Sequence, residues 1–380
     1  MASSLVGAAI SLVVCHGGPA THFATFAESL RDEGYTVQVY ASGPALDKLR
    51  EYKIDGVIPF SADKLSREDE LKLAAQIAKI CSTASVVLTD VGHLFDISLQ
   101  KALEKEAPQV LRLAYYDNPE SYVPGGYSST AADVMLAAQK VLFANANLVE
   151  VPLYREPDRA IDLPKERRVA LGYYQTELAE KIAKCRETKQ GALREKFFTQ
   201  QGLKDDGQKI WVYFGGNNEE YFTKAFPALL QFLTEGERKE GLSNYIIILQ
   251  QHPGARRENR DGEQLKEWIE QENRQLKIFK SNWTTDDMQV IADGGLYYQT
   301  SMGPQFILAG IPMVQVGHNT YEDILVKNNL CPSVTNSSAF LSATAKIERT
   351  PQTKEQKEAL FKSLGIRADW LNTFEQLIKK

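Results

Sequence analysis

The feature that most constrains the fold is the alternation of short, continuously apolar runs with longer amphipathic stretches. The runs are rich in β-branched residues and apolar at successive positions, which is typical of parallel strands buried on both faces of a sheet. Parallel strands are joined by crossover helices, and the amphipathic stretches supply them. The first half has predicted strands at residues 10–15, 36–41, 57–60, 85–90, 110–116 and 140–144, with helices at 22–33, 67–82 and 94–106. We predict a doubly wound α/β domain here.

A second series of the same kind follows a charged, helix-favouring connector at residues 151–208. Its predicted strands are residues 209–214, 245–250, 276–279, 295–299 and 313–316, with helices at 219–234, 262–273, 285–291 and 304–308. After residue 353 only an amphipathic helical pattern remains. We therefore predict two Rossmann-like domains, 1–160 and 161–352, and a C-terminal helix, 353–380, that packs back on the first.

Length and charge narrow the class of protein. The chain has 380 residues, 43% hydrophobic and 24% charged, which suits two ordinary globular domains. A net charge of -5 gives no basic surface, so we expect no nucleic-acid partner. The apolar residues 5–15 are too short to span a bilayer and are interpreted as a strand, so no transmembrane segment is expected. Four scattered cysteines favour a reducing, cytoplasmic location and predict no structural metal.

All five histidines, His16, His22, His93, His252 and His318, directly follow a predicted strand or begin the next helix. Ligands of open parallel sheets bind outside the carboxyl ends of the strands. This placement therefore predicts functional edges on both sheets, facing a shared cleft.

The loop after the first strand, residues 15–23, reads CHGGPATHF. Gly17 and Gly18, next to His16, permit a close approach of the backbone to a ligand. Neither GxGxxG nor GxxxxGK[ST] is present, and a tight turn without a ligand stays as the alternative. The dipole of the following helix is expected to lower the pKa of His22, which suits a neutral general base.

Acidic side chains and a histidine follow the fourth and fifth predicted strands: Asp90, His93, Asp117 and Glu120. A carboxylate beside a histidine fixes its tautomer and raises its basicity, so this edge is a candidate for acid–base chemistry. Capping of the following helix is the commoner role for an aspartate placed as Asp90 is, and both roles stay open.

Three strand ends of the second half carry candidate phosphate-binding or nucleotide-binding groups. The first loop offers Gly215, Gly216 and Asn217, and the second offers His252 before Pro253, with Arg256 and Arg257 nearby. The third loop offers Thr300, Ser301, Met302 and Gly303 before a helix. In such a charged stretch, an individual arginine is more often solvated than bound to a ligand.

The whole pattern resembles the GT-B glycosyltransferase fold. The most specific segment is ADGGLYYQTSMGPQFILAGIPMVQVG, residues 292–317, which is similar to the donor-binding segment of that group. The stretches GGPATHF and DNPESYVPGG resemble loops of the peptidoglycan N-acetylglucosaminyltransferase group. The resemblance implies a nucleotide sugar on the C-terminal domain, an acceptor on the N-terminal domain, no metal and no cofactor.

By the same resemblance His22 is the base that deprotonates the acceptor hydroxyl, with the Asp90 and His93 edge as the alternative. Ser301, Gly303 and the loop 215–217 would hold the donor diphosphate, with His252 near the nucleotide. Where many members place a glutamate for the ribose, this chain has Gln305, which loses a charge-assisted bond. UDP is the expected nucleotide, and CMP or CDP stays compatible with the HPG at residues 252–254.

The prediction is thus a metal-independent glycosyltransferase that moves a sugar from a nucleotide sugar to an acceptor hydroxyl. One alternative is a non-hydrolysing UDP-sugar 2-epimerase, for which Asp90, Asp117, Glu120 and His252 would act around the sugar. The other is a non-catalytic domain that binds a nucleotide or a protein partner. The acceptor is not identified by the sequence, peripheral membrane contact is compatible with it, and a monomer or a homodimer is expected.

Overall fold

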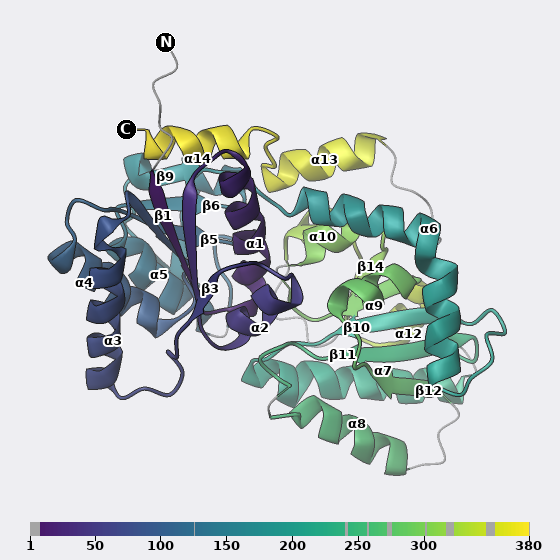
Figure 1. Ribbon diagram of the computed structural model, residues 1–380. Coiled ribbons are helices and arrows are strands. Elements are labelled where there is room, and N and C mark those ends of the chain that lie inside the picture. Colours follow the sequence, from purple (N-terminus) through teal and green to yellow (C-terminus); the bar gives the residue numbers. More distant parts are fainter. Residues whose placement is uncertain are drawn as a thin grey trace. The chain divides into compact units, whose positions relative to one another are not determined.

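The computed structural model describes residues 8–124, 126–239, 242–256, 258–271, 276–300, 302–316, 323–346 and 354–379. The chain divides into two compact units, the first running to Gln175 and resuming at Phe361, the second comprising Thr176–Leu360. Each unit is a parallel sheet with helices on both faces (Figure 1), so the predicted α/β class with two Rossmann-like domains is confirmed.

The sheet of the first unit has the order β3-β2-β1-β4-β5-β6-β9, and all its strands are parallel. Its strands are β1 (Ala9–Val14), β2 (Thr36–Ala41), β3 (Val57–Pro59), β4 (Val86–Thr89), β5 (Leu111–Tyr116), β6 (Lys140–Phe143) and β9 (Arg168–Ala170). Strands β7 (Tyr154–Glu156) and β8 (Arg159–Ala160) form a separate antiparallel sheet of two strands. The order reverses between β1 and β4, which is where open α/β sheets bind ligands.

The helices of the first unit are α1 (Gly17–Asp32), α2 (Gly43–Glu51), α3 (Arg67–Ile80), α4 (Leu94–Glu106), α5 (Tyr127–Ala137) and α14 (Trp370–Ile378). Helices α1 and α2 lie on one face of the sheet, and α3, α4 and α5 on the other (Figure 1). Helix α1 begins at Gly17, not at residue 22 as predicted, so His22 lies inside the helix.

An aromatic cluster holds the C-terminal helix on the first unit. The ring of Trp370 lies 4.7 Å from that of Tyr173 and 5.2 Å from that of Phe26 in α1. The hydroxyl of Tyr35 donates to Glu375 at 3.0 Å. The C-terminal segment therefore belongs to the first unit, and the division falls inside α13 (Lys354–Leu364), at Leu360, not at residue 352.

The first boundary also differs from the prediction, because the first unit continues past residue 160 to Gln175. Strand β9 lies in this stretch and pairs with β6 as the edge of the first sheet. It has three residues, all of them partly exposed and preceded by charged neighbours, so the connector showed no apolar run to mark it.

The second unit repeats the same strand order, β12-β11-β10-β13-β14-β15, again all parallel. Its strands are β10 (Lys209–Phe214), β11 (Tyr245–Gln250), β12 (Lys277–Lys280), β13 (Gly294–Tyr297), β14 (Met313–Val316) and β15 (Ser333–Val334). Its helices are α6 (Thr176–Gln200), α7 (Phe226–Arg238), α8 (Arg260–Gln271), α9 (Thr285–Ile291), α10 (Gly303–Leu308), α11 (Ile324–Lys327) and α12 (Ser337–Lys346). The order reverses between β10 and β13.

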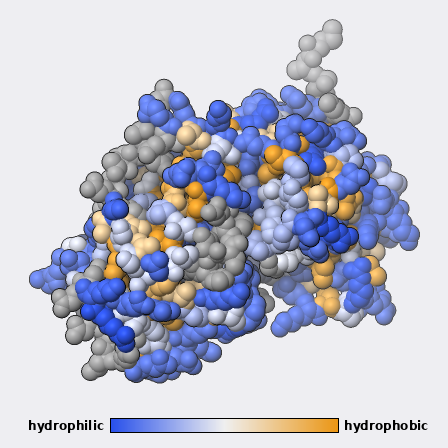
Figure 2. Space-filling view, turned by 180° about the vertical axis from the view of Figure 1, so that it is seen from behind, coloured by the Kyte–Doolittle hydropathy of each residue, from blue (hydrophilic) through white to orange (hydrophobic). Residues whose placement is uncertain are grey.

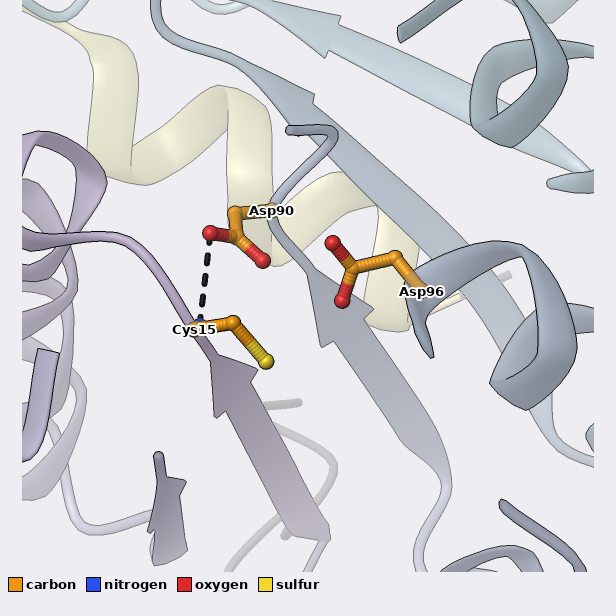
Figure 3. A group of neighbouring side chains, drawn as sticks. All are labelled: Cys15, Asp90 and Asp96. Carbon is orange, nitrogen blue, oxygen red and sulfur yellow. Dashed lines mark hydrogen bonds between the residues drawn. The ribbon is translucent and has the colours of Figure 1, made fainter. Parts of the chain in front are cut away.

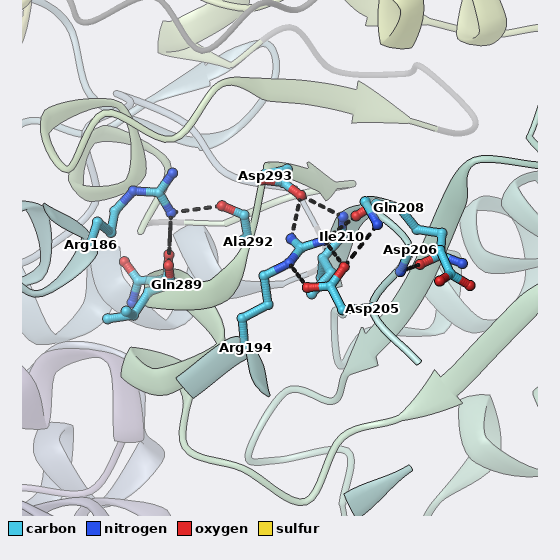
Figure 4. A network of polar contacts seen from close by, with 11 residues as sticks. Arg186, Arg194, Asp205, Asp206, Gln208, Ile210, Gln289, Ala292 and Asp293 are labelled. Atoms are coloured by element: carbon cyan, nitrogen blue, oxygen red, sulfur yellow. Dashed lines mark hydrogen bonds and ion pairs between the residues drawn. The ribbon is translucent and has the colours of Figure 1, made fainter. Parts of the chain in front are cut away.

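Two arginines fix the long helix α6 to the second unit (Figure 4). Arg186 donates to the carbonyls of Gln289 at 2.6 Å and Ala292 at 2.7 Å, which caps the end of α9. Arg194 pairs with Asp293 at 2.9 Å, and the same carboxylate oxygen accepts the backbone N–H of Ile210 at 2.8 Å. The connector helix is thereby tied to the start of β10.

On the face shown in Figure 2, small groups of hydrophobic residues lie scattered among polar ones. Within the described part of the chain no helix combines the length and apolar character needed to cross a membrane.

Candidate functional site

Asp90 joins the ends of the two central strands of the first sheet. It follows β4, is fully buried, and its Oδ2 accepts the backbone N–H groups of Cys15 at 3.3 Å and His16 at 3.0 Å, which follow β1. The same oxygen lies 3.1 Å from Nδ1 of His16. Of the two roles that the sequence left open for Asp90, capping of the following helix is therefore not the one it has. It orients a histidine at the point where the strand order reverses.

His16 has the geometry of a general base. Its side chain is 39% exposed, and Nδ1 faces the Asp90 carboxylate, so the neutral ring carries its proton on Nδ1 and presents the lone pair of Nε2. Burial by itself lowers the pKa of His16, but the hydrogen bond and charge of Asp90 outweigh it, and the pKa is raised above 6.5. A Cβ at Gly92 would lie 2.8 Å from the ring, so only glycine leaves room for this pose.

His93 adjoins this pair, with its ring 5.7 Å from that of His16. It is the N-cap of α4, where its Nδ1 accepts the N–H of Phe95 at 3.1 Å. Burial, and then the charge of His16, lower the pKa of His93. In the neutral ring the proton therefore lies on Nε2, which is 3.9 Å from Oδ1 of Asp63.

Asp117 and Glu120 follow β5 at the same edge of the sheet. Asp117 is buried and accepts the hydroxyl of Tyr127 at 2.8 Å, and burial raises its pKa to about 6. Glu120 is half-buried, and its carbonyl accepts the hydroxyl of Tyr116 at 2.8 Å. Asp117 is thus a carboxyl group able to exchange a proton near neutral pH.

His22 lies in a different environment from His16. It is 8% exposed, its Nδ1 lies 2.6 Å from the hydroxyl oxygen of Tyr115, and its ring packs against Tyr173. Its pKa is lowered to about 3, and the cause is burial and not the expected position at a helix start. Of the neighbouring glycines, Gly17 begins α1, and the carbonyl of Gly18 accepts the hydroxyl of Thr21 at 2.8 Å.

At the edge of the second sheet, Gly215 and Gly216 make room for a side chain of the protein itself. A Cβ at Gly215 would lie 2.7 Å from the hydroxyl of Tyr221, and one at Gly216 would lie 2.9 Å from its ring. The Tyr221 hydroxyl donates to the buried Asp261 at 2.9 Å, while Asn217 is exposed. Packing by Tyr221 therefore accounts for both glycines, and their predicted contact with a phosphate stays a prediction.

The loop after β11 holds His252 half-buried, with its Nδ1 accepting the N–H of Gly254 at 3.0 Å. Gln251 beside it is buried and donates to Asp261 at 2.7 Å, so Asp261 links this loop to Tyr221. Arg256 is exposed. Arg257 and His318 lie outside the described residues.

The loop after β13 contains Thr300, whose hydroxyl oxygen accepts the N–H of Met302 at 3.1 Å, and Gly303, which begins α10. Ser301 lies outside the described residues. Gln305 is buried, and its amide donates to Oε1 of Gln289 at 3.2 Å, so the predicted ribose ligand turns into the core of its own unit.

The loops after β10 and β13 meet at the reversal of the second sheet. The amide of Asn218 donates to Oε1 of Gln299 at 3.0 Å, and both side chains are half-buried. Neither residue belongs to a pattern that predicts a site from the sequence. This pair lies where ligands of such sheets bind, and it is uncharged.

One group among the described residues has metal-ligand spacing: Cys15, Asp90 and Asp96, whose ligand atoms lie within 4.8 Å of one another. The donor set fits a cation poorly. Burial, and then the charges of Asp96 and Asp90, raise the pKa of the Cys15 thiol well above its ordinary value, which opposes the thiolate that a metal needs. Oδ2 of Asp90 already faces three nitrogen atoms. We assign no metal here.

Sequence reasoning missed Gly92 and Asp96 at this edge. A signal for Asp96 was present, since it stands three residues after His93 at the spacing of a capping box, and its Oδ2 accepts the His93 N–H at 3.1 Å. Gly92 carried no signal, because the need for it arises from the pose of His16.

No protein-family model matches the chain, and no curated protein sequence matches it. The two sheets and their shared strand order define the GT-B fold, as the resemblance predicted. Among solved structures, the chain is similar to UDP-GlcNAc 2-epimerase from Neisseria meningitidis bound to UDP-GlcNAc, at 11% identity over 98% of this chain and 100% of that chain, with a TM-score of 0.68.

The chain is also similar to a glycosyltransferase from Rickettsia africae, at 14% identity over 98% of each chain, with a TM-score of 0.62. UDP-GlcNAc 2-epimerase from Methanocaldococcus jannaschii matches at 12% identity over 94% of this chain and 99% of that chain, with a TM-score of 0.62. At such identities the likeness establishes the fold, and the activity has to be argued from the site.

The environment of His22 predicts a pH dependence of stability. The unfolded chain binds a proton on His22 near pH 6.5, whereas the folded chain does so only near 3, so stability is lost as the pH falls through this window. His22→Gln should flatten the curve of unfolding free energy against pH by about 1.4 kcal/mol per pH unit there, measured by urea denaturation. Tyr115→Phe, which keeps His22 buried, should retain the wild-type slope. Parallel curves for wild type and His22→Gln would contradict this assignment.

The close contact between Gly92 and the His16 ring predicts that a substitution at Gly92 changes the titration of His16. In Gly92→Ala the added methyl group displaces the His16 ring from Asp90, so the midpoint of the His16 titration should move to lower pH, measured by NMR. Gly191→Ala is the matched control, because no atom lies within 4 Å of a Cβ there. An unchanged His16 midpoint in Gly92→Ala would show that the ring does not depend on this glycine.

Proposed function

We propose that the protein transfers a sugar from a nucleotide sugar to an acceptor hydroxyl, with His16 as the general base. The observation that carries the proposal is the His16–Asp90 pair, since a buried carboxylate fixes the histidine tautomer and leaves Nε2 to accept a proton. This pair stands at the order reversal of a fold that the chain shares with a glycosyltransferase and with UDP-GlcNAc 2-epimerases.

The base in this proposal is His16 and not His22, which the resemblance favoured. A base with a pKa near 3, held between tyrosines, takes up almost no proton at neutral pH. The raised pKa and partial exposure of His16 suit the role far better. His93 and Asp117 are then neighbours that shape the acceptor site.

The second unit is proposed to bind the nucleotide. Its sheet edge offers the uncharged Asn218–Gln299 amide pair, which suits a base or a ribose more than a bare anion, and the half-buried His252 lies in a neighbouring loop. UDP is the proposed nucleotide, because the similar epimerase from Neisseria meningitidis is bound to UDP-GlcNAc and the one from Methanocaldococcus jannaschii is also a UDP-GlcNAc 2-epimerase.

A second candidate function is epimerisation at C2 of a UDP sugar. It is favoured by Asp117, a buried carboxyl group with a pKa of about 6 at the same edge as Asp90, since elimination and re-addition require groups that exchange protons with the sugar ring. A third outcome is a protein that binds the nucleotide without turnover.

A ligand panel followed by product analysis tests the function. Of UDP, GDP, CDP, CMP and ADP, we expect UDP to raise the melting temperature most, corresponding to about 2.7 kcal/mol at a concentration a hundredfold above Kd. With UDP sugars, transfer predicts nucleotide release that depends on an added acceptor. Conversion of the UDP sugar alone would support the epimerase, and stabilisation without turnover would support a binding role.

The assignment of the base predicts a specific loss. His16→Ala should lower kcat by about 10²- to 10⁴-fold, because the proton of the acceptor loses its base. In the wild type kcat should fall as the pH drops through the pKa of His16, which lies above 6.5, and the variant should lack this limb. His22→Gln is the comparison and should keep most of its kcat. If His22→Gln lost about 10²-fold or more in kcat while His16→Ala kept the wild-type kcat, the base would be His22.

A further inference from the structure

Asp90 faces a second carboxyl group, that of Asp96, in the interior of the first unit. Both side chains are fully buried, and Figure 3 shows the two carboxyl groups pointing toward each other beside Cys15. Asp96 lies in the first turn of α4, where the N–H of His93 donates to its Oδ2 at 3.1 Å. The capping box thus fixes Asp96 against Asp90.

The hydrogen bonds of the two groups are unequal. Oδ2 of Asp90 receives two backbone N–H groups and faces the His16 ring, whereas Asp96 accepts one N–H. The Oδ1 atoms of both residues are buried and receive no N–H or O–H from another residue. Oxygen atoms of the two groups lie within 4.8 Å of each other, and two buried carboxylates so close do not both ionise. A proton on one of them makes it a donor to the other.

We propose that Asp96 is a neutral carboxylic acid at physiological pH and donates a hydrogen bond to the Asp90 carboxylate, which makes it a positioning residue for the His16–Asp90 pair. Burial, and then the charge of Asp90, raise the pKa of Asp96 well above its usual range. Burial acts in the same direction on Asp90, but the hydrogen bond and charge of His16 outweigh it and lower the pKa of Asp90.

The titratable groups around Asp90 and Asp96 are consistent with a single proton shared by the two carboxyl groups. They include Cys15 after β1, His16 at the start of α1, His93 in the loop before α4, Asp63 after β3 and Asp117 after β5. Burial raises the pKa of the Cys15 thiol and lowers the pKa of His93, so both are neutral near pH 7. His16 is the group among these that takes up a positive charge, and its Nδ1 faces Oδ2 of Asp90 at 3.1 Å, so it favours ionisation of Asp90 and leaves the proton on Asp96.

A neutral donor has a consequence for His16. It holds Asp90 in place without adding a second negative charge, which would raise the pKa of His16 further and keep it protonated. This consequence rests on the proposed function, whereas the protonation state of Asp96 does not.

The test compares Asp96→Asn with Asp90→Asn by NMR titration of His16. Asparagine is neutral and donates a hydrogen bond, so Asp96→Asn should leave the His16 midpoint unchanged, whereas Asp90→Asn removes an anion and should shift the midpoint to lower pH. A shift to lower pH in Asp96→Asn as well would show that Asp96 is ionised and would overturn the proposal.

Infrared spectroscopy of the wild type gives a second measurement that needs no variant to fold. At about pH 8, above the pKa of about 6 for Asp117, the C=O band of a protonated carboxylic acid should be present. The band should vanish in Asp96→Asn and persist in the matched control Asp117→Asn. No such band in the wild type, or one bound metal ion per chain by mass spectrometry, would overturn the proposal. Neither readout uses turnover, so an inactive protein with the expected spectra would count only against the proposed function.

Discussion

A single buried carboxylate, that of Asp90, organises the edge of the first sheet. It bridges β1 and β4 by accepting the N–H groups of Cys15 and His16, where the strand order reverses. A buried charge is tolerated only when its oxygens are fully hydrogen-bonded, and each charged hydrogen bond contributes about 1.5 to 3 kcal/mol. The pose of His16 and the protonation proposed for Asp96 both follow from this requirement.

The two units share a strand order but differ in the chemistry of their edges. The first edge carries titratable side chains, among them His16, Asp90 and Asp117. In the described part of the second edge, the Asn218–Gln299 amides link two loops, and the buried carboxylate of Asp261 accepts from Tyr221 and Gln251. In the proposed function, the first edge carries out proton transfer and the second recognises uncharged groups of the nucleotide.

The sequence predicted the longer strands closely, because a strand buried on both faces needs an unbroken apolar run. Strands β9 and β15 were not predicted, because β9 has three residues and β15 has two, which is too short for an apolar run. Less of the site can be predicted from the sequence. All five histidines stood near strand ends in the sequence, but the roles of His16 and His22 depend on tertiary contacts, an Asp90 carboxylate in one case and Tyr115 with Tyr173 in the other.

The segment that carried the resemblance, residues 292–317, shows why a motif can indicate a fold without indicating a ligand. Two of its glycines are explained by packing: a Cβ at Gly294 would lie 2.7 Å from the Trp211 ring, and one at Gly303 would lie 2.8 Å from Leu325. Gly310 has a φ of +74° and open space around it, so its backbone conformation explains it. Gln305 of the same segment bonds to Gln289 inside the unit. Close packing and backbone conformation therefore account for these residues without a ligand, so the chemistry of the protein has to be argued from His16 and Asp90.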